Sequence, residues 1–146
     1  MALQIKFEKL KDTAMLPTKA TADAAGHDLY ACLDSSLMLL PHRTIKIGTG
    51  LAFEMPEGYF GAIFGRGHLA VNHGIRPANG VGVIDPDYRG ELFISLHNDS
   101  EKAYTIHPND RIAQIVFIPY LSDFTFVESP LSETDRDKEN IGSTGH

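Results

Sequence analysis

The sequence predicts one all-β domain, arranged as a sandwich or a barrel of short strands. Three observations indicate this class: apolar and polar residues alternate along most of the chain, turn-forming residues interrupt the alternation at short intervals, and only one short segment favours a helix. The length of 146 residues fits a single domain that buries its own core. Hydrophobic residues make up 42% and charged residues 22%, which is typical of a folded globular protein.

Each alternating segment places its apolar side chains largely on one face of an extended strand. In chain order, the residues predicted to share a face are Ile5 and Phe7; Ile45 and Ile47; Leu51, Phe53 and Met55; Tyr59, Gly61 and Ile63; Leu92, Ile94 and Leu96; Ile112, Gln114 and Val116; and Phe124 and Phe126.

Turn signals separate these segments. They are Pro41, Pro56-Glu57-Gly58, Asp85-Pro86-Asp87, Asn98-Asp99-Ser100 and Pro108-Asn109-Asp110. The single helix is predicted from Leu69 to His73, with Gly74 placed to end it. No linker, repeat or second domain is visible, so residues 1–130 are predicted to form the β domain.

The charge balance argues against a polymeric nucleic-acid partner. Thirteen Lys and Arg residues against nineteen Asp and Glu residues give a net charge of −6, the wrong sign for neutralising a phosphate backbone. A single nucleotide is still compatible with this charge, because a few convergent Arg side chains, backbone N–H groups and Mg²⁺ can hold a triphosphate.

Cellular location is predicted from cysteine usage and the N-terminal pattern. Cys32 is the only cysteine, so no intramolecular disulfide forms and a reducing cytoplasm is the simplest location. Residues Met1 to Leu10 alternate in polarity and lack the apolar block of a signal peptide, and no segment has the roughly 18 apolar residues of a membrane span.

The tail, residues 131–146, differs from the rest of the chain. A charged stretch from Glu133 to Glu139 precedes the run Gly142-Ser143-Thr144-Gly145. Composition alone favours a disordered terminus. Ordered over a ligand, the same Gly-Ser-Thr-Gly run could surround phosphates with N–H and hydroxyl donors.

Two glycine-containing segments are candidates for metal and anion binding. In Ala25-Gly26-His27-Asp28-Leu29, the carboxylate of Asp28 is either a solvated turn residue or is aimed at a metal's bound water. In the segment from Gly65 to Ala70, the glycines on either side of Arg66 allow backbone N–H groups and the guanidinium to approach an anion at the start of the helix. A plain strand-to-helix turn fits the second segment equally well, and His68 there is either a ligand, a proton carrier or a surface residue.

The segment from Asn79 to Gly90 is the most informative. Asn79-Gly80 is a strong hairpin signal, and the glycine-rich arm that follows offers main-chain donors and acceptors that can read a flat base. An amide, a carboxylate and a tyrosine, Asn79, Asp85 and Tyr88, lie along this one strand and turn. The segment is either a binding site or a solvated turn.

Gln114 interrupts an otherwise apolar strand from Asp110 to Phe117. A buried amide must be paired. Its partner is either neighbouring backbone or a bound phosphate or water.

Taken in this order, the segments resemble the five motifs of the trimeric deoxyuridine triphosphatases, from about Gly26 to Gly145. The family's first motif, Ala-Gly-x-Asp-Leu, matches residues 25–29, and its third, Gly-Val-Ile-Asp-x-Asp-Tyr-Arg-Gly, matches residues 82–90 in full. The fourth, Arg-Ile-Ala-Gln, matches residues 111–114.

The resemblance implies a jelly-roll-like β fold and Mg²⁺-dependent hydrolysis of dUTP to dUMP and pyrophosphate. It also implies a homotrimer with three active sites, each built from motifs of different chains and closed by a neighbour's tail. Asp85 would hold and polarise the attacking water, and Asp28 would meet Mg²⁺ through coordinated water.

The remaining site residues are also implied by the resemblance. Asn79 and main chain near Gly82 would read uracil, and Tyr88 would pack on the deoxyribose and exclude a 2′-hydroxyl. Arg66, Gln114 and Arg136 would hold phosphates or ordered water. Further substrate-binding positions are Gly67, His68, Val83, Ile84, Arg111, Ile141, Gly142, Ser143 and Thr144.

Two motifs depart from the family pattern. Gly67 stands where the second motif carries a serine that contacts the phosphates, so one hydroxyl donor is missing unless His68, a backbone N–H or a water replaces it. The fifth motif, normally Arg-Gly-x-Gly-Gly-Phe-Gly-Ser-x-Gly, has lost three glycines and its aromatic residue. Ile141 cannot stack on uracil as a phenyl ring would, and Asp137 and Glu139 bring negative charge towards the ligand, so we expect weaker or slower closure of the tail.

Two other functions compete with this interpretation. The dCTP deaminases share the scaffold but need a glutamate in the strand after the third motif, where this chain has Ser95, and a hydroxyl cannot transfer that proton at neutral pH. The other alternative is a dUTP-binding regulatory protein that has lost turnover.

Overall fold

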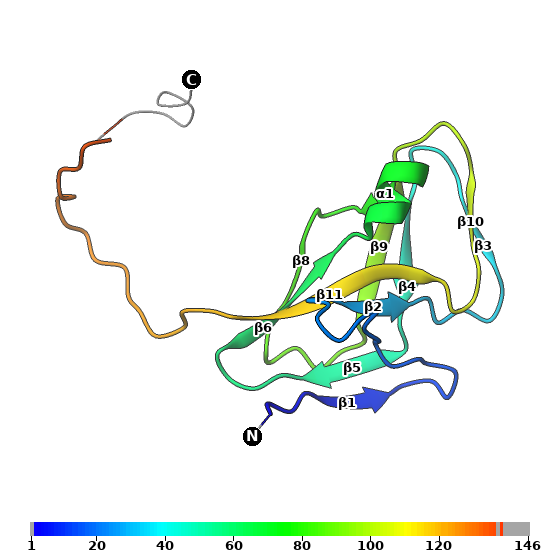
Figure 1. The fold of residues 1–146 in the computed structure, drawn as a ribbon, viewed down its shortest axis with the longest axis horizontal. Coiled ribbons are helices and arrows are strands. Elements are labelled where there is room, and N and C mark those ends of the chain that lie inside the picture. Colours follow the sequence, from blue (N-terminus) through cyan, green and yellow to red (C-terminus); the bar gives the residue numbers. More distant parts are fainter. Residues whose placement is uncertain (1, 137, 139–146) are drawn as a thin grey trace.

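Across residues 2–136 and 138, which this computed structural model describes, the chain forms eleven strands and one helix (Figure 1). The predicted all-β class is therefore confirmed. The elements are β1 (Lys6–Lys9), β2 (His27–Tyr30), β3 (Leu37–Leu39), β4 (Thr44–Gly48), β5 (Leu51–Glu54), β6 (Tyr59–Phe64), α1 (Gly67–His73), β7 (Ile75–Pro77), β8 (Gly82–Ile84), β9 (Phe93–Asn98), β10 (Tyr104–Ile106) and β11 (Arg111–Pro119).

The strands pair mostly with partners that are distant in the sequence. A four-stranded sheet has the order β2-β11-β6-β8 and a three-stranded sheet has the order β4-β9-β7, while β1 pairs with β5 and β3 with β10. Every pairing is antiparallel. This arrangement is jelly-roll-like, as the family resemblance implied.

The core lies between these sheets and consists mainly of aliphatic side chains. The largest fully buried ones are Leu29, Leu39, Ile47, Leu51, Ile75, Ile94, Leu96, Ile106, Ile112 and Ile115. Each such side chain contributes about 1.5–3 kcal/mol when it leaves water, so the core can hold a rigid scaffold around surface loops. The predicted inward residues of β9 and the adjoining loop, Leu92, Ile94 and Leu96, are all buried.

A β-bulge in β11 changes which of its residues share a face. Arg111 lies opposite Tyr30 of β2, but Ala113 lies opposite Leu29, so Ile112 is the extra residue. The prediction that Ile112, Gln114 and Val116 share one face is therefore wrong. The buried residues are Ile112, Ala113 and Ile115, and the bulge brings Arg111 and Gln114 onto the outer face.

The predicted helix is confirmed and begins two residues earlier than expected. It runs from Gly67 to His73, and Gly74 ends it in the left-handed conformation with φ 68°, which glycine adopts without strain. Leu69 is its buried residue. No helix in the described part of the chain is long and apolar enough to cross a membrane.

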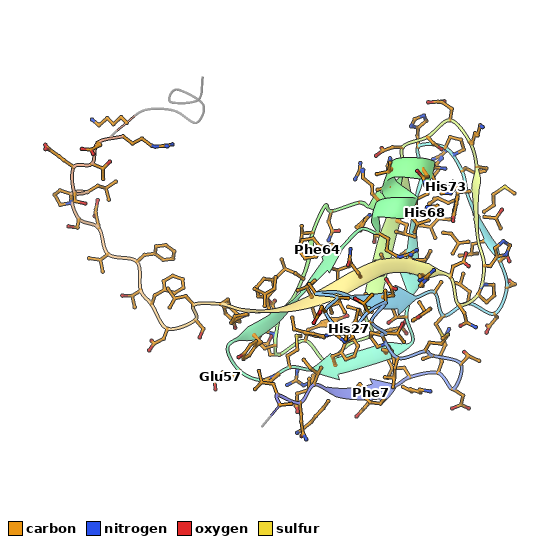
Figure 2. The ribbon with its side chains drawn as sticks, viewed as in Figure 1. Phe7, His27, Glu57, Phe64, His68 and His73 are labelled. Carbon is orange, nitrogen blue, oxygen red and sulfur yellow. The ribbon has the colours of Figure 1, made fainter. Side chains whose placement is uncertain are left out.

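Three local predictions differ from the structure. Phe124 and Phe126 do not form a strand, since residues 120–136 contain no regular element and Phe126 is 94% exposed. The Asn79-Gly80 turn forms but is not a hairpin turn, because β7 before it pairs with β9 and β8 after it pairs with β6. Strand β1 forms as expected, but Phe7 stays exposed (Figure 2).

Candidate active site

The predicted site residues fall into two groups along strand β6. Gln114 pairs with Phe64 at the carboxyl end of β6, next to Gly65 and Arg66. Gly82 and Ile84 of β8 pair with Ile63 and Gly61, so the chain leaves β8 towards the amino end of β6. The first group, residues 28, 66, 111 and 114, lies at the carboxyl end of β6. The second group, residues 79–88, begins near that end, where Gly82 lies opposite Ile63, and continues to Asp85 towards the amino end.

Asp28 is the centre of the first group. Its Oδ1 lies 3.4 Å from Nε of Arg66, and its Oδ2 lies 3.6 Å from NH1 of Arg111. The side chains of Asp28 and Arg66 are only 16% and 20% exposed, so this pair is screened less by water than a surface pair. Arg66 also donates from NH1 to the carbonyl oxygen of Arg111 at 3.2 Å. The two guanidinium groups therefore share one carboxylate.

The Gln114 amide forms a hydrogen bond with the protein backbone, one of the two partners that the sequence left open. Its Nε2 donates to the carbonyl oxygen of Gly65 at 2.9 Å, which fixes the strand end that carries Arg66. Gly26 on the neighbouring segment provides the space, because a Cβ atom there would overlap Oε1 of Gln114. A side chain at position 26 would therefore displace the Gln114 amide, whose Oε1 points towards Gly26.

Gly67 and His68 follow Arg66 at the start of α1. A Cβ atom at Gly67 would have nothing within 4 Å, so the position of the family's serine is open space. His68 Nδ1 lies 2.8 Å from Nδ2 of Asn72, and its ring packs edge-on against His73 at 5.3 Å between centroids (Figure 2). With the amide nitrogen of Asn72 as donor, Nδ1 is the acceptor, and the ring proton resides on Nε2.

A hollow of about 150 Å³ lies beside this group and is lined by Arg66, His68, Tyr104 and Arg111, among others. Tyr104 stacks against His73 with 5.0 Å between ring centroids. Burial, followed by the nearby Asp110 carboxylate, raises the pKa of Tyr104, while Arg66 opposes the rise. The phenol is therefore neutral at physiological pH.

The second group is built on β8 and the loop that follows it. Gly82 packs against Ile63, where a Cβ atom would lie 3.2 Å from the Cβ of Ile63. A cavity of about 110 Å³ opens here, lined by Asn79, Gly82, Phe93 and Ser95, among others. Because β8 is the edge strand of its sheet within the described residues, one row of its main-chain groups is available to a ligand.

Asp85 and Tyr88 follow β8 in a tight loop. Tyr88 N–H donates to the carbonyl oxygen of Asp85 at 3.1 Å, and its hydroxyl donates to the carbonyl oxygen of Glu91 at 2.8 Å. Gly90 lies under the ring, since a Cβ there would be 2.6 Å from the Tyr88 hydroxyl oxygen. The Asp85 carboxylate is exposed and, among the described residues, has no side-chain partner. It borders a hollow with Val83, Phe60 and Tyr120.

One chain does not bring the two groups together. Asp85 follows Ile84, which lies opposite Gly61, and Arg66 follows the other end of β6 by two residues. Continued in extended register, this separation is about six residues, which is roughly 20 Å at about 3.3 Å per residue. Arg66 and Asp85 of the same chain therefore cannot contact one phosphate group.

Of the tail residues that the sequence marks as substrate-binding, only Arg136 lies in the part of the chain that the structure describes. Arg136 is exposed and lies in a bend outside every strand. Ile141, Gly142, Ser143 and Thr144 lie outside the described residues.

His27, beside Asp28, is a polar group that the sequence did not mark. Its Nδ1 is buried without a hydrogen-bond partner among the described residues. Burial, followed by the charge of Lys19, lowers its pKa, and Asp28 acts in the opposite direction. Its ring therefore stays neutral to lower pH than that of a free histidine.

Sequence reasoning also missed Asn72, although the four-residue spacing from His68 on a helix was a usable signal. The sequence pointed to Ser95 only as the counterpart of a deaminase glutamate, and the side chain does line the cavity with Asn79 and Gly82. No sequence signal pointed to Glu54, which lies at the end of β5 and contacts Arg89 in the loop after β8.

Comparisons with known proteins agree with this geometry. A family model described as dUTPase matches residues 12–145. The deoxyuridine 5'-triphosphate nucleotidohydrolase of Desulfitobacterium hafniense is 42% identical over 144 residues, covering 98% of this chain and 95% of the relative. That of Syntrophotalea carbinolica is 40% identical over 143 residues, covering 98% and 97%.

Solved structures share the fold at lower identity. A variant of the Staphylococcus bacteriophage 80alpha dUTPase with dUpNHpp superposes with a TM-score of 0.86 at 24% identity, covering 98% of this chain and 99% of that one. A dUTPase variant from phage phi11 of S. aureus, described with a structural Mg(II) ion, has a TM-score of 0.77 at 22% identity, covering 88% and 99%. With the family model spanning nearly the whole length and relatives at about 40% identity, this chain belongs to the dUTPase family, the family of the dUTP diphosphatases.

Proposed function

We propose that this chain hydrolyses dUTP to dUMP and pyrophosphate, with water attacking the α-phosphorus. The observation that carries the proposal is the exposed Asp85 carboxylate, which follows directly after the cavity-forming strand β8. The names of the curated relatives, deoxyuridine 5'-triphosphate nucleotidohydrolases, support the same substrate.

The nucleoside would lie against β8. The amide of Asn79 and the main chain of Gly82, Val83 and Ile84 supply the donors and acceptors that a uracil edge requires, and the cavity they line is small. The ring of Tyr88 is held by its bond to the Glu91 carbonyl, so it can pack on a deoxyribose and leave no space for a 2′-hydroxyl.

Asp85 would act on the water. Its carboxylate accepts a hydrogen bond from a water molecule and takes up a proton from that water as the water oxygen bonds to the α-phosphorus. The bond from that phosphorus to the bridging oxygen breaks, and pyrophosphate leaves with the electron pair. Because the carboxylate has no described side-chain partner, no ion pair must be broken first.

The first group would hold the phosphates. Arg66, Arg111 and Gln114 converge around Asp28, and a guanidinium is suited to bidentate phosphate contacts. At Gly67 only the backbone N–H can donate, and the Nε2–H of His68 is the donor that replaces the missing serine hydroxyl. Arg136 would add a further cation when the tail, residues 131–146, closes together with Ile141 to Thr144.

A homotrimer would complete each site. The estimated separation of roughly 20 Å between Arg66 and Asp85 of one chain supports a site in which the phosphate-binding residues and the water-holding Asp85 come from different chains. Half-buried apolar residues on the outer face of the β2-β11-β6-β8 sheet, including Phe64, Val116 and Ile118, provide a surface that a partner could cover.

The donor set of the site fits a magnesium ion that is held mainly by the substrate. The described residues contain no cluster of three or more His, Cys, Asp or Glu side chains that could hold a metal by themselves. Mg²⁺ commonly keeps its waters and binds through one or two carboxylates and the phosphates, and Asp28 supplies one carboxylate. When bound, the ion would offset charge on the phosphate oxygens.

The test is a substrate panel. Purified protein with Mg²⁺ is incubated with dUTP, UTP, dCTP or dTTP, and pyrophosphate and ammonia are measured. Release of pyrophosphate from dUTP alone is expected. Binding of dUTP without release would favour a regulatory binding protein, a candidate suggested by the empty space at Gly67, and ammonia from dCTP would favour a deaminase. The cytoplasmic location suggested by the single cysteine stays a prediction.

A further inference from the structure

Arg89 closes the loop that carries Asp85. Its NH1 donates to the carbonyl oxygen of Pro86 at 2.6 Å and to that of Tyr88 at 3.4 Å. The guanidinium thus bridges the carbonyl oxygens of Pro86 and Tyr88, and Pro86 is the residue directly after Asp85.

Glu54 at the end of β5 holds Arg89 from outside the loop. Its Oε1 lies 3.1 Å from NH2 of Arg89, and its Oε2 lies 2.9 Å from Nζ of Lys6. Lys6 and Glu54 are directly opposite each other in the β1–β5 pairing, so the carboxylate is fixed from both sides. Surface hollows of about 560 and 300 Å³ lie beside these three side chains.

The Arg89–Glu54 ion pair ties residues 85–90 to β5, and these residues have few other contacts outside their own loop. The remaining bonds of residues 85–90 run within the loop or to Glu91, such as the Tyr88 N–H to the Asp85 carbonyl. Across the part of the chain that the structure describes, the Arg89–Glu54 pair is the one side-chain tie from residues 85–90 to another strand.

The charge state of Glu54 agrees with this role. The hydrogen bond from Lys6 is the largest influence, followed by the charges of Lys6 and Arg89, and together they hold the pKa of Glu54 below its usual range. The carboxylate is therefore ionised wherever the enzyme would operate.

We propose that Glu54 is a positioning residue for hydrolysis, acting through Arg89 and the Pro86 carbonyl to fix the direction of the Asp85 side chain. This inference rests on the proposed function of Asp85. It goes beyond that function, because it assigns a catalytic effect to a residue of β5 that does not contact the substrate.

Two substitutions test the contributions of Glu54 and Arg89 separately. Glu54→Ala removes the outer attachment, and because exposed ion pairs are weak we expect kcat to fall about two- to fivefold with KM nearly unchanged. Arg89→Lys keeps a positive charge but loses the planar fork that reaches Glu54 and Pro86 together, so we expect a larger fall, about tenfold. In the double variant the losses should not add, because both act through one contact.

A matched control is Asp99→Ala, which removes a different exposed ion pair. Asp99 Oδ2 lies 2.5 Å from Nε of Arg76, and both side chains are about as exposed as those of Glu54 and Arg89. Arg76 lies on β7 and Asp99 directly follows β9, and neither contacts residues 85–90. Arg76 also donates to the carbonyl oxygens of Pro77 and Ala78, beside Asn79, so the comparison rests on kcat, which should stay at the native value.

The second readout does not depend on activity. Hydrogen exchange of the Tyr88 amide, which is bonded to the Asp85 carbonyl, should accelerate in Glu54→Ala and stay native in Asp99→Ala. Native kcat and native exchange in Glu54→Ala would overturn the positioning role while leaving dUTP hydrolysis intact. If the native protein failed to hydrolyse dUTP, the proposed function would fail, and accelerated exchange would still show that Glu54 holds the loop.

Discussion

Nε of Arg66 lies 3.4 Å from Oδ1 of Asp28, although the two residues come from different strand ends of one sheet. The β-bulge at Ile112 adds Arg111 to the same carboxylate. Three charged side chains are therefore oriented before any ligand arrives. Such preorganisation reduces the cost of arranging phosphate donors during the reaction.

The effect of replacing His68 should depend on whether position 67 is glycine or serine. Since His68 is proposed to replace the missing serine hydroxyl, His68→Ala should lower kcat for dUTP by about tenfold or more, towards the roughly 10²- to 10³-fold that loss of one such donor costs in other enzymes. In a Gly67→Ser background, where the added side chain meets open space, the same His68→Ala change should be nearly silent. Steady-state kinetics of the four proteins test this. Unchanged turnover in His68→Ala alone would remove the histidine from the mechanism.

Gly26→Ala should disturb Gln114. The new Cβ would overlap Oε1, so the amide must move and give up its bond to the Gly65 carbonyl. A loss of stability of about 1–2 kcal/mol is expected, measured by urea unfolding. Gly67→Ala is the matched comparison and should cost nothing comparable, because no atom lies near its Cβ. Equal stabilities of Gly26→Ala and the native protein would contradict the close packing.

His27 should make stability depend on pH. The folded state lowers the pKa of His27 below its ordinary value of 6.5, so the unfolded chain binds more protons in the window between the lowered and the unperturbed pKa. This contribution to stability is complete above the unfolded pKa and is lost as pH falls through the folded pKa.

The variant His27→Leu removes both the titration and the unpaired Nδ1. Its thermal midpoint relative to the native protein should rise as pH is lowered from about 7 to about 5, a range that spans the pKa of an unperturbed histidine. A difference in midpoint that stays constant with pH would show that His27 does not titrate as described.

Truncation at Leu131 should affect substrate binding but not folding. Leu131 is 94% exposed, and residues 131–136 belong to no strand or helix, so the thermal midpoint should not change. If the tail closes over a neighbour's site, loss of Arg136 should raise KM for dUTP, by less than about tenfold because Asp137 and Glu139 oppose the contact. Equal KM values would show that the tail contributes nothing.

Local patterns predicted much of the fold and of the site composition. The alternation of Leu92, Ile94 and Leu96 identified a buried strand face, and Gly74 identified the end of α1, because both signals depend only on nearby residues. The motif order also predicted family membership, which the comparisons confirm.

Features that depend on distant partners could not be predicted in this way. The bulge at Ile112 is defined by pairing with β2, more than 80 residues earlier, and Asn79-Gly80 joins two sheets because β7 and β8 find partners elsewhere. Phe124 and Phe126 are residue types that favour strands, but no strand of the described chain pairs with their segment, and their two rings contact each other edge-on. No local sequence pattern pointed to Glu54, because its partner Arg89 lies in a distant segment of the chain.

The role of Asp85 is most directly tested by replacing it. Asp85→Ala and Asp85→Asn are compared with the native protein by pyrophosphate release from dUTP, while binding of a non-hydrolysable dUTP analogue is measured separately. We predict that turnover falls by about 10²-fold or more, because the water loses its acceptor, and that the analogue still binds. Hydrolysis at the native rate in Asp85→Ala would contradict the account.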